Sequence, residues 1–439
     1  MNPIRVGLIG TGVVGRGVLN VLSRNAGEIA RRAGRDIVVR RVGARDVAKA
    51  KGIAGGLVGH DVSVDDPMTV ATAPDVDVVV EVIGGTTTAK EVILAALNAG
   101  KPVVTANKAL LALHGNEIFA AARAKGVAIT FEAAVAGGIP IIKALREGLA
   151  ANRIQWVAGI INGTTNFILS EMRSKKLPYA TVLAQAQKLG YAEADPTFDV
   201  EGIDAAHKLT ILAAIAFGIP VQFDKAHIEG ISTLQAQDIA YAEELGYRIK
   251  LLGITRRHAA GVELRVHPTL VPTKRLIANV EGAMNAVLVK GDAVGATLYY
   301  GAGAGSEPTA SAVVADLVDV TRLITADPKH RVPALAFQHE SLSDIPILPM
   351  GEVETAYYLR LRVADEAGVL ADITRILADA TISIDAVLQK EASEGEGETD
   401  LIILTHSVKE KQINTAISRM EMLRAVTGKV VRIRQEDLS

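Results

Sequence analysis

Residues 4–15, which read IRVGLIGTGVVG, decide the fold of the first part of the chain. An apolar run predicts a strand over Ile4–Ile9, and a helical stretch follows the motif Gly10-Thr11-Gly12-Val13-Val14-Gly15. Glycines at these three positions permit a tight turn, a close approach of a pyrophosphate to the backbone, and close helix–strand packing. The N-terminus of the helix also favours an anion. The segment therefore predicts a dinucleotide-binding domain rather than a purely structural turn.

The alternation of strands and helices continues after this segment. Apolar runs predict further strands at 36–42, 76–83, 102–105 and 127–131, which gives a Rossmann-type, doubly wound α/β sheet over residues 1–140. Arg45 and Asp46 stand side by side after the second strand. An acid there suits the free ribose of NAD, whereas an arginine suits the extra phosphate of NADP. Both cofactors stay open, with NADP slightly favoured.

A second informative segment, residues 190–217, reads GYAEADPTFDVEGIDAAHKLTILAAIAF. Its second half predicts a helix over Ile203–Phe217 that is apolar around nearly its whole circumference, which indicates burial. Asp204 and Lys208 lie four residues apart and share one face of this helix. An exposed ion pair is the ordinary interpretation of that spacing. Because charged groups are rarely buried without a partner or a task, the apolar surroundings favour a catalytic pair.

Three loops could approach a ligand. Thr105-Ala106-Asn107-Lys108 places a lysine at the carboxyl end of a strand, where ligands of open α/β sheets gather, although Lys108 could also be a solvated surface residue. The small-residue loop 132–140 could be a hinge, or its carbonyls could hold a cation. The glycine-rich loop 301–308 precedes a helix, so the segment 301–340 could return to the cofactor domain or serve as a connector.

The remainder of the chain predicts two further domains and a linker. Residues 141–300 lose the strict alternation and predict an α+β substrate-binding and dimerisation domain, with strands at 154–161, 262–267, 286–290 and 295–300. Residues 341–355 contain prolines and little periodicity, which is typical of a linker. Residues 356–439 predict the β-α-β-β-α-β order of a ferredoxin-like domain, with an acidic turn at 391–398.

Composition excludes several classes of protein. The chain has 439 residues, a formal net charge of −2 and no cysteine. The charge implies no general attraction to nucleic acid or anionic membrane, and the absence of cysteine excludes disulfides, thiolate metal sites and thiol nucleophiles. The first residues show no signal-peptide pattern, and the most apolar run, 211–219, is about half of the ~20 residues that span a bilayer. We expect a soluble, cytoplasmic protein that binds neither nucleic acid nor membrane.

With these residues in view, the chain resembles the homoserine dehydrogenases of the long bacterial type. The matching stretches are TANKAL (105–110), GIINGTTNFIL (159–169), LGYAEADPTFDVEGIDAAHKL (189–209) and YYGAGAGSEPTASAVVADLV (299–318). The resemblance implies an NAD(P)-dependent interconversion of L-homoserine and L-aspartate 4-semialdehyde, on the route from aspartate to threonine and methionine. Because this chemistry combines hydride transfer with proton transfer, an ammonium group in an apolar pocket suits it.

The stretch LRVADEAGVL (361–370) resembles the turn of an ACT domain. This resemblance implies a small amino-acid pocket shaped by Asp365 and Gly368, and end-product control by L-threonine. Relatives commonly have proline before that glycine, where this chain has Ala367. A dimerisation sheet without a ligand is the alternative interpretation of the module.

The motifs and the resemblance together assign individual roles. Lys208 would be the proton donor and acceptor, with Lys108 and Asp204 beside it, and a homodimer or homotetramer is expected. Substrate-binding roles fall on Glu193, Asp199, Asp204 and Lys108. Cofactor-binding roles fall on Gly10, Thr11, Gly12, Val13, Val14, Gly15, Arg45, Thr105, Lys108, Gly190 and Gly305. The backbone carbonyls of Glu132, Val135, Gly137 and Ile139 match a structural sodium site.

Two rival functions are weighed against this one. Aspartate-semialdehyde dehydrogenase combines a similar cofactor fold with a related substrate, but its chemistry needs a cysteine, which this chain lacks. A non-catalytic regulator that senses nucleotides or amino acids would keep the glycine motif and the ACT module. Such a regulator would have no reason to place Asp204 and Lys208 on an apolar helix, so the enzyme is preferred.

Overall fold

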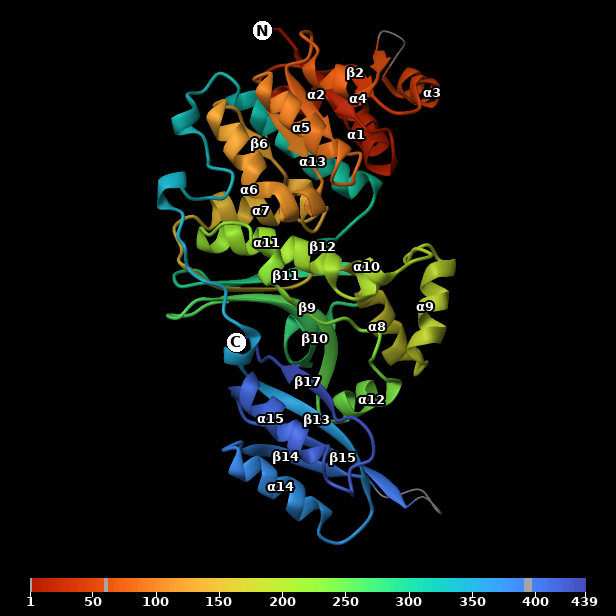
Figure 1. Cartoon of the computed structure of the whole chain (residues 1–439). Helices are drawn as coiled ribbons and strands as arrows, with labels where there is room; N and C mark the ends of the chain where they lie inside the picture. Colours follow the sequence, from red (N-terminus) through yellow and green to blue (C-terminus); the bar gives the residue numbers. More distant parts are fainter. Residues whose placement is uncertain (1, 59–61, 391–396) are drawn as a thin grey trace. The chain divides into compact units, whose positions relative to one another are not determined.

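The computed structural model describes residues 2–58, 62–390 and 397–439 (Figure 1). The chain forms two compact units, each assembled from segments that are far apart in the sequence. The first unit comprises Met1–Gly163, Ile203–Ala226 and Ala283–Ile345, and the second comprises Thr164–Gly202, His227–Gly282 and Pro346–Ser439. The predicted domain segments 1–140, 141–300, 341–355 and 356–439 stay predictions.

A parallel sheet of six strands forms one part of the first unit, in the order β3-β2-β1-β4-β5-β6. This is the order of the doubly wound dinucleotide-binding fold, so the predicted Rossmann-type sheet is confirmed. β3 is absent from the sequence prediction because three residues carry too little pattern to be recognised. The strands are β1 Ile4–Ile9, β2 Ile37–Gly43, β3 Ser63–Asp65, β4 Val78–Glu81, β5 Val103–Thr105 and β6 Ile129–Thr130. The helices between and after them are α1 Val13–Arg24, α2 Ala26–Ala33, α3 Val47–Val58, α4 Pro67–Thr72, α5 Thr88–Asn98 and α6 Lys108–Ala124.

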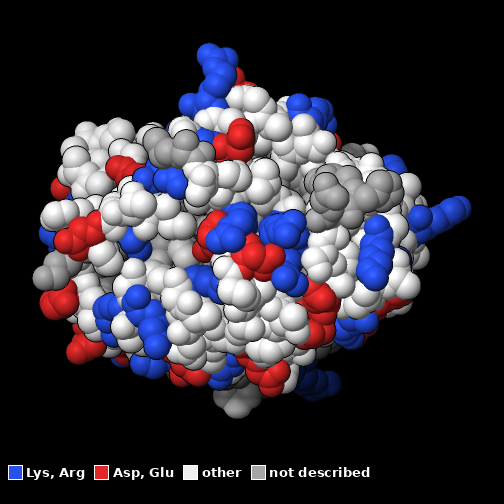
Figure 2. Space-filling model, turned by 90° about the horizontal axis from the view of Figure 1, so that it is seen from above, with Lys and Arg blue, Asp and Glu red and all other residues white. Residues whose placement is uncertain are grey.

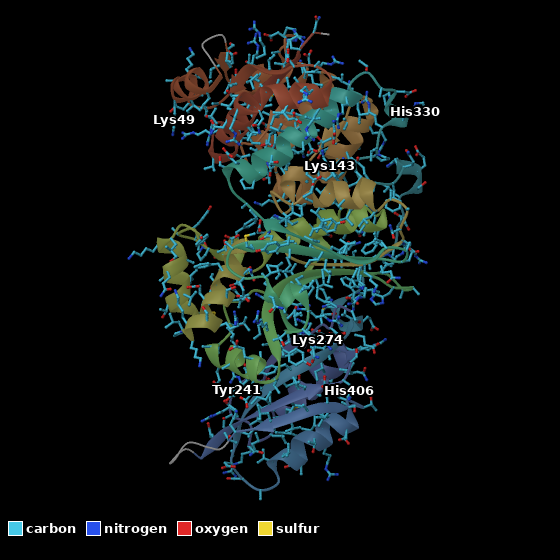
Figure 3. All side chains as sticks on the ribbon, turned by 180° about the vertical axis from the view of Figure 1, so that it is seen from behind. Lys49, Lys143, Tyr241, Lys274, His330 and His406 are labelled. Carbon is cyan, nitrogen blue, oxygen red and sulfur yellow. The ribbon has the colours of Figure 1, made fainter. Side chains whose placement is uncertain are left out.

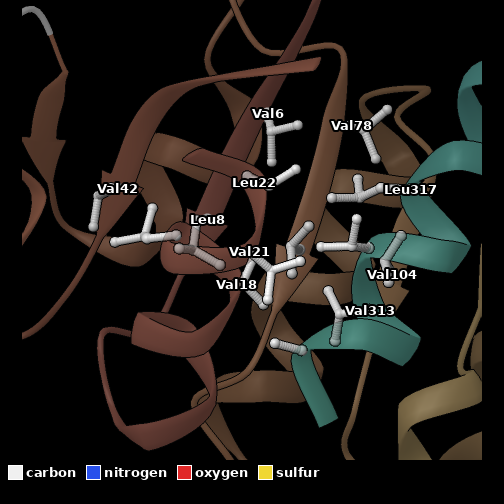
Figure 4. Close-up of a cluster of buried hydrophobic side chains, with 14 of the residues drawn as sticks. Val6, Leu8, Val18, Val21, Leu22, Val42, Val78, Val104, Val313 and Leu317 are labelled. Atoms are coloured by element: carbon white, nitrogen blue, oxygen red, sulfur yellow. The ribbon is translucent and has the colours of Figure 1, made fainter. Parts of the chain in front are cut away.

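The core of this sheet is built mainly from valine side chains, together with alanine and leucine (Figure 4). Val6 and Val78 lie on adjacent strands, and Val18 comes from α1. Val313 and Leu317 join the same cluster from α13, Ser306–Leu323. A helix from late in the chain therefore completes the core of the sheet that the first residues begin.

An antiparallel sheet and a buried helix complete the first unit. β11 pairs with both β7 and β12, as the predicted strands in this region require. α11 is buried at every position from residue 204 to residue 217 and packs against α6 and β7, which confirms a helix covered on all sides. The elements are η1 Glu132–Ala134, α7 Ile141–Lys143, η2 Ala144–Gly148, β7 Ile154–Ile160, α11 Ile203–Phe217, η3 Phe223–Lys225, β11 Met284–Gly291, β12 Gly295–Ala302, η5 Pro328–His330 and η6 His339–Ser341.

The second unit begins with helices and a long antiparallel pair, β9 with β10. β9 is absent from the sequence prediction, because Arg248 and Lys250 interrupt its apolar pattern. Both cations have partners: Lys250 Nζ lies 2.5 Å from the carbonyl oxygen of Val280, and Arg248 Nη1 lies 2.7 Å from Asn279 Oδ1. The elements are α8 Gly163–Lys175, α9 Tyr179–Lys188, α10 Thr197–Val200, β8 His227–Ile228, α12 Ala236–Glu244, β9 Tyr247–Arg257, β10 Val262–Pro272 and η4 Leu276–Asn279.

The C-terminal part of the second unit has the predicted β-α-β-β-α-β order, with one extra short strand, β16. Its antiparallel sheet has the strand order β17-β13-β15-β14, which confirms the ferredoxin-like module. Most of the acidic turn predicted at 391–398 lies outside the described residues. The elements are η7 Met350–Glu352, β13 Glu354–Ala364, α14 Val369–Asp379, β14 Ile384–Gln389, β15 Glu398–Thr405, β16 Val408–Lys409, α15 Glu410–Met420 and β17 Val431–Gln435.

A buried ionic network joins this module to the rest of the second unit, where β17 pairs in parallel with β10. The Arg434 guanidinium on β17 donates to Glu229 at 2.7 Å and to Glu410 at 2.7 Å. Burial alone would raise the pKa of Glu229, but hydrogen bonds from Arg434 and His227 hold it well below its usual value. On β10, Arg265 donates to Glu263 at 2.8 Å. Arg265 also donates to Glu436, the residue after β17, at 2.5 Å. Because buried charges need close partners, this ion pair fixes the end of β17 against β10.

Tyr241 of α12, labelled in Figure 3, adds a second contact with the module by donating to Asp400 at 2.9 Å. Among the described residues, no helix combines the length and the hydropathy that crossing a bilayer requires. On the face of the molecule seen in Figure 2, acidic and basic side chains are intermingled.

Candidate active site

A cavity of about 1060 Å³ lies in the first unit at the carboxyl ends of β1, β2 and β4. Four of the six motif residues line it: Gly10, Thr11, Gly12 and Val13. Val14 instead packs against the core of the sheet, and Gly15 is buried beneath the turn. Ligands of doubly wound sheets bind at this edge, so the position of the cavity matches the sequence prediction.

The backbone around this cavity fits a dinucleotide. Gly10 has φ +110°, which favours glycine, and a Cβ on Gly15 would lie 2.0 Å from the carbonyl oxygen of Gly10. A Cβ on Gly12 would meet nothing within 4 Å, which leaves room beside α1. Because Gly12 has no side chain to cap α1, the first N–H groups of that helix can bind a pyrophosphate.

The wall of the cavity carries mixed charges. Arg16, Arg45 and Lys49 line it together with one acid, Asp46. Asp46 accepts a hydrogen bond from the backbone N–H of Lys49 at 2.9 Å, so its carboxylate caps the start of α3. Lys49, labelled in Figure 3, lies on α3. The cations outnumber the acid, and the acid is already bound to backbone.

Glu81 is a buried acid beside the cavity that the sequence analysis did not identify. It ends β4 with a fully buried side chain and accepts hydrogen bonds from Thr105 Oγ1 at 2.7 Å and from the backbone N–H of Ile83 at 2.8 Å. Burial raises the pKa of Glu81, and these hydrogen bonds oppose the increase. Glu81 therefore holds the loop that follows β4, whose Gly84 and Ile83 line the cavity.

The loop after β5 links the cavity to the predicted catalytic residues. Thr105, a predicted cofactor residue, is buried and bound to Glu81. Asn107 donates to the carbonyl oxygen of Gly85, which lines the cavity, at 2.7 Å, and caps α6 by accepting from Leu110. Lys108 is the first residue of α6. The cap therefore fixes the backbone position from which the side chain of Lys108 extends.

Asp204 brings the two predicted lysines together. Its Oδ2 lies 2.6 Å from Lys208 Nζ, and its Oδ1 lies 3.3 Å from Lys108 Nζ. Lys208 also donates to the carbonyl oxygen of Ile161 at 2.8 Å, at the end of β7. Asn162, which the sequence analysis did not single out, donates to Asp204 at 2.9 Å. The segment GIINGTTNFIL contains Asn162, but its distance in sequence from Asp204 hides the contact.

The electrostatics of this cluster favour a charged carboxylate. Asp204 is 3% exposed and Lys208 is 9% exposed. Burial alone would raise the pKa of Asp204, but the charges of Lys208 and Lys108 and the hydrogen bonds from Lys208 and Asn162 lower it to about 2. A single carboxylate therefore stays ionised between two ammonium groups near neutral pH.

The remaining predicted site residues lie outside the cluster around Asp204. Gly190, Glu193 and Asp199 lie in the second unit and their roles stay predictions. Gly190 has φ +79° in the turn after α9, and the side chain of Glu193 is exposed. Asp199 accepts from Thr164 Oγ1 at 3.3 Å. Gly305 precedes α13 with φ +134°, and the next residue, Ser306, lines the cavity.

The predicted sodium loop lies in η1 and the turn after it. Glu132 is buried, and its carboxylate accepts from the backbone N–H groups of Ile142 and Lys143. Burial and the nearby Asp316 raise the pKa of Glu132 to about 7. Lys143, labelled in Figure 3, lies 3.4 Å from Asp316. The described residues gather no three acidic or histidine side chains suited to a metal, and the backbone sodium site at Glu132, Val135, Gly137 and Ile139 stays a prediction.

The predicted regulatory turn lies between β13 and α14 and is exposed. Asp365 donates its backbone N–H to the carbonyl oxygen of Gly397 at 3.0 Å. Gly368 has φ +100°, which favours glycine, and precedes α14. The role of these two residues in binding an amino acid stays a prediction.

His207, next to Lys208, gives this cluster a pH dependence. Its ring is 4% exposed and packs against Phe223, with 4.3 Å between ring centroids. Burial lowers the pKa of His207 to about 4, with Asp204 opposing the shift and the two lysines adding to it. In the unfolded chain His207 is protonated below about pH 6.5, whereas in the folded chain it stays neutral down to about pH 4. The free energy of unfolding therefore decreases as the pH falls from about 6.5 to about 4.

We predict that His207 contributes a loss of about 2 kcal/mol in the free energy of unfolding between pH 7 and pH 5. The His207→Gln variant should lose that much less than the wild type over the same interval, because glutamine does not titrate. Denaturant unfolding at both pH values measures the two losses. Equal losses in the two proteins would show that His207 is protonated in the folded state at pH 5.

Comparison with known proteins identifies the family. The profile described as homoserine dehydrogenase matches residues 140–318, the NAD-binding domain of homoserine dehydrogenase matches residues 10–132, and the ACT domain matches residues 357–423. The chain is 62% identical to a homoserine dehydrogenase of Pseudomonas aeruginosa over 439 residues, which covers 100% of both chains.

Solved structures give the same result. A homoserine dehydrogenase from Thiobacillus denitrificans is 68% identical, with a TM-score of 0.95 over 100% of this chain and 99% of that one. A hyperthermophilic archaeal homoserine dehydrogenase in complex with NADPH is 25% identical, with a TM-score of 0.63 over 74% of this chain and 99% of that one. The cavity, the cluster around Asp204 and these similarities lead to one conclusion: the chain belongs to the homoserine dehydrogenase family.

Proposed function

We propose that this chain interconverts L-aspartate 4-semialdehyde and L-homoserine, with Lys208 as the proton donor and acceptor. The observation that carries this proposal is the Asp204 carboxylate, which accepts from Lys208 Nζ at 2.6 Å while Lys108 Nζ lies 3.3 Å from its other oxygen. One buried carboxylate thereby holds two ammonium groups at a fixed place.

A bound nicotinamide would supply or accept the hydride of this reaction, and the glycine loop and the start of α1 would hold its pyrophosphate. The residues of the chain would bind the substrate and transfer the proton. As the aldehyde is reduced, negative charge grows on its oxygen, which a nearby ammonium stabilises and then protonates. Lys208 suits this task because Asp204 and the carbonyl of Ile161 fix the position of its nitrogen.

The substrate is an amino acid with an ammonium and a carboxylate of its own. Lys108, at the start of α6, can attract the carboxylate or the reacting oxygen. Glu193 and Asp199 are acids suited to the substrate ammonium. A sensor that only binds nucleotides would need none of these groups, and burying the pair of Asp204 and Lys208 would destabilise it without benefit.

We predict that Lys208→Ala lowers kcat by about 10²–10⁴-fold, the usual contribution of a general acid or base. The Kd for NADPH should stay within about twofold of the wild-type value. Lys208→Arg keeps the charge but cannot release its proton near neutral pH, so it should be nearly as slow. Homoserine-dependent formation of NADPH measures turnover, and the exposed Lys125→Ala serves as the matched control. Near-native kcat in Lys208→Ala would remove Lys208 from the proton-transfer step.

NADP is proposed as the preferred cofactor. Three cations, Arg16, Arg45 and Lys49, line the cofactor cavity, and Asp46 caps α3. The extra phosphate of NADP would form ion pairs with these cations, whereas the ribose hydroxyls of NAD need a free acid as a hydrogen-bond acceptor. The NADPH complex of the archaeal relative supports this preference.

We predict that Arg45→Ala raises KM for NADP about tenfold or more, the loss of one charge-assisted hydrogen bond, and changes KM for NAD less than twofold. Steady-state kinetics with both cofactors gives the two values. Lys51→Ala, on an exposed position of the same helix α3, is the control. Equal effects on both cofactors would place Arg45 away from the ribose.

L-threonine is proposed as the effector of the ACT module. The exposed turn with Asp365 and Gly368 could bind it, and the bonds from Arg434 to Glu229 join the module to the rest of the second unit.

We predict that saturating L-threonine lowers activity and raises Tm, that D-threonine does neither, and that Asp365→Ala abolishes both effects. Asp379→Ala, at the end of α14, is the control. An unchanged rate and an unchanged Tm in the wild type would contradict the proposal.

A further inference from the structure

The two residues that follow β7 contact both members of the buried ion pair on α11. The carbonyl oxygen of Ile161 accepts from Lys208 Nζ at 2.8 Å, and Nδ2 of the next residue, Asn162, donates to Asp204 Oδ2 at 2.9 Å. Lys208 Nζ donates to the same Oδ2 at 2.6 Å. The end of one strand therefore binds the ammonium through its backbone and the carboxylate through a side chain.

The backbone that carries Asn162 is closely packed. Asn162 is 4% exposed and lies between β7 and α8. A Cβ on the next residue, Gly163, would lie 2.7 Å from the carbonyl oxygen of Ala283, so no larger residue fits there without a shift of the backbone. The amide therefore reaches Asp204 from a fixed point outside α11.

The helix alone does not fix the geometry of the ion pair. An exposed pair with this i,i+4 spacing is worth about 0.3–0.5 kcal/mol, because ordering two side chains offsets most of the attraction. Lys108 Nζ lies 3.3 Å from Asp204 Oδ1, which is longer than a good hydrogen bond. The amide of Asn162 adds a charge-assisted hydrogen bond of ordinary length from another element. Because the amide is neutral, it orients the carboxylate without competing with the two ammonium charges.

We propose that Asn162 is a positioning residue for proton transfer, an inference that rests on the proposed role of Lys208. By donating to Asp204 Oδ2, Asn162 keeps the carboxylate in the orientation in which it holds Lys208 Nζ. This role requires no contact between Asn162 and the substrate or the cofactor. Since a displacement of about 1 Å at a catalytic group can cost about 10²-fold in rate, loss of the amide should slow the chemical step.

The test measures kcat in single and double variants by homoserine-dependent formation of NADPH. Asn162→Leu keeps the branching of the side chain but has no donor, so it should lower kcat roughly tenfold or more and leave KM for NADP within about twofold. Added to Lys208→Ala, the same substitution should lower kcat by less than about twofold, because the group that Asn162 positions is already absent. A residue that only supports the fold would slow both backgrounds by the same factor.

Asn116→Leu is the matched control. Asn116 on α6 donates to the carbonyl oxygen of Val221 at 2.9 Å and accepts from the backbone N–H of Val221 at 3.0 Å. It thus joins α6 to the segment after α11, two helices that pack against each other (Figure 1), but lies about two turns from Lys108. This variant should lower the free energy of unfolding and leave kcat unchanged.

A second variant covers the case in which Asn162→Leu does not fold. Asn162→Asp has the same shape, but near pH 8 its ionised carboxylate cannot donate to Asp204 and repels it. It should therefore also lower kcat roughly tenfold or more at that pH.

The outcomes separate this inference from the proposed function. A slow Lys208→Ala beside wild-type kcat in Asn162→Leu, or in Asn162→Asp near pH 8, would overturn the inference and leave the proposed function standing. A further loss of roughly tenfold in the double variant would also overturn it, since Asn162 would then act independently of Lys208. Near-native kcat in Lys208→Ala would contradict the proposed function, and the inference with it.

Discussion

The carboxylate of Asp204 is the centre on which the site depends. It is buried on α11 and contacts two ammonium groups that come from different parts of the chain, Lys208 on its own helix and Lys108 at the start of α6. Removing Asp204 would leave the buried ammonium of Lys208 without its carboxylate, at a cost of several kcal/mol. The cluster therefore requires that α11, α6 and the end of β7 meet at one point, and the packing of α11 on both neighbours provides this.

Glu81 connects the position of Lys108 to the wall of the cofactor cavity. This acid binds the loop that follows β4 and, through Thr105, the loop that leads to Lys108. One wall of the cavity and one ammonium of the Asp204 cluster are therefore both held by Glu81. A change that loosens Glu81 should disturb cofactor binding and catalysis together, although Glu81 itself lies beneath both.

Sequence patterns predicted those parts of the structure whose signal is local. The glycine motif before α1, the apolar helix α11 and the order of elements in the C-terminal module were predicted correctly, because each element has its own local pattern. Contacts between distant residues were not visible. Asn162 and Asp204 are 42 residues apart, and Thr105 and Glu81 are 24 apart. β9 was not predicted because a lysine in the middle of its sequence argues against a buried strand. The structure buries Lys250 by pairing it with Asn166 of α8 and with the carbonyl oxygen of Val280, just after η4.

The proposed regulation by the ACT module would have to act through the ionic network of the second unit. Arg434 on β17 holds Glu229, and Gly230 follows it against α10, where a Cβ would lie 2.6 Å from the carbonyl oxygen of Val200. The backbone N–H of Ile231 donates to that same oxygen at 2.8 Å. A movement of β17 must therefore either break buried ionic bonds, which is costly, or carry this segment with it. α10 bears Asp199, so a ligand that shifts the C-terminal module acts on a substrate-binding candidate through packed, charged contacts rather than through a flexible linker.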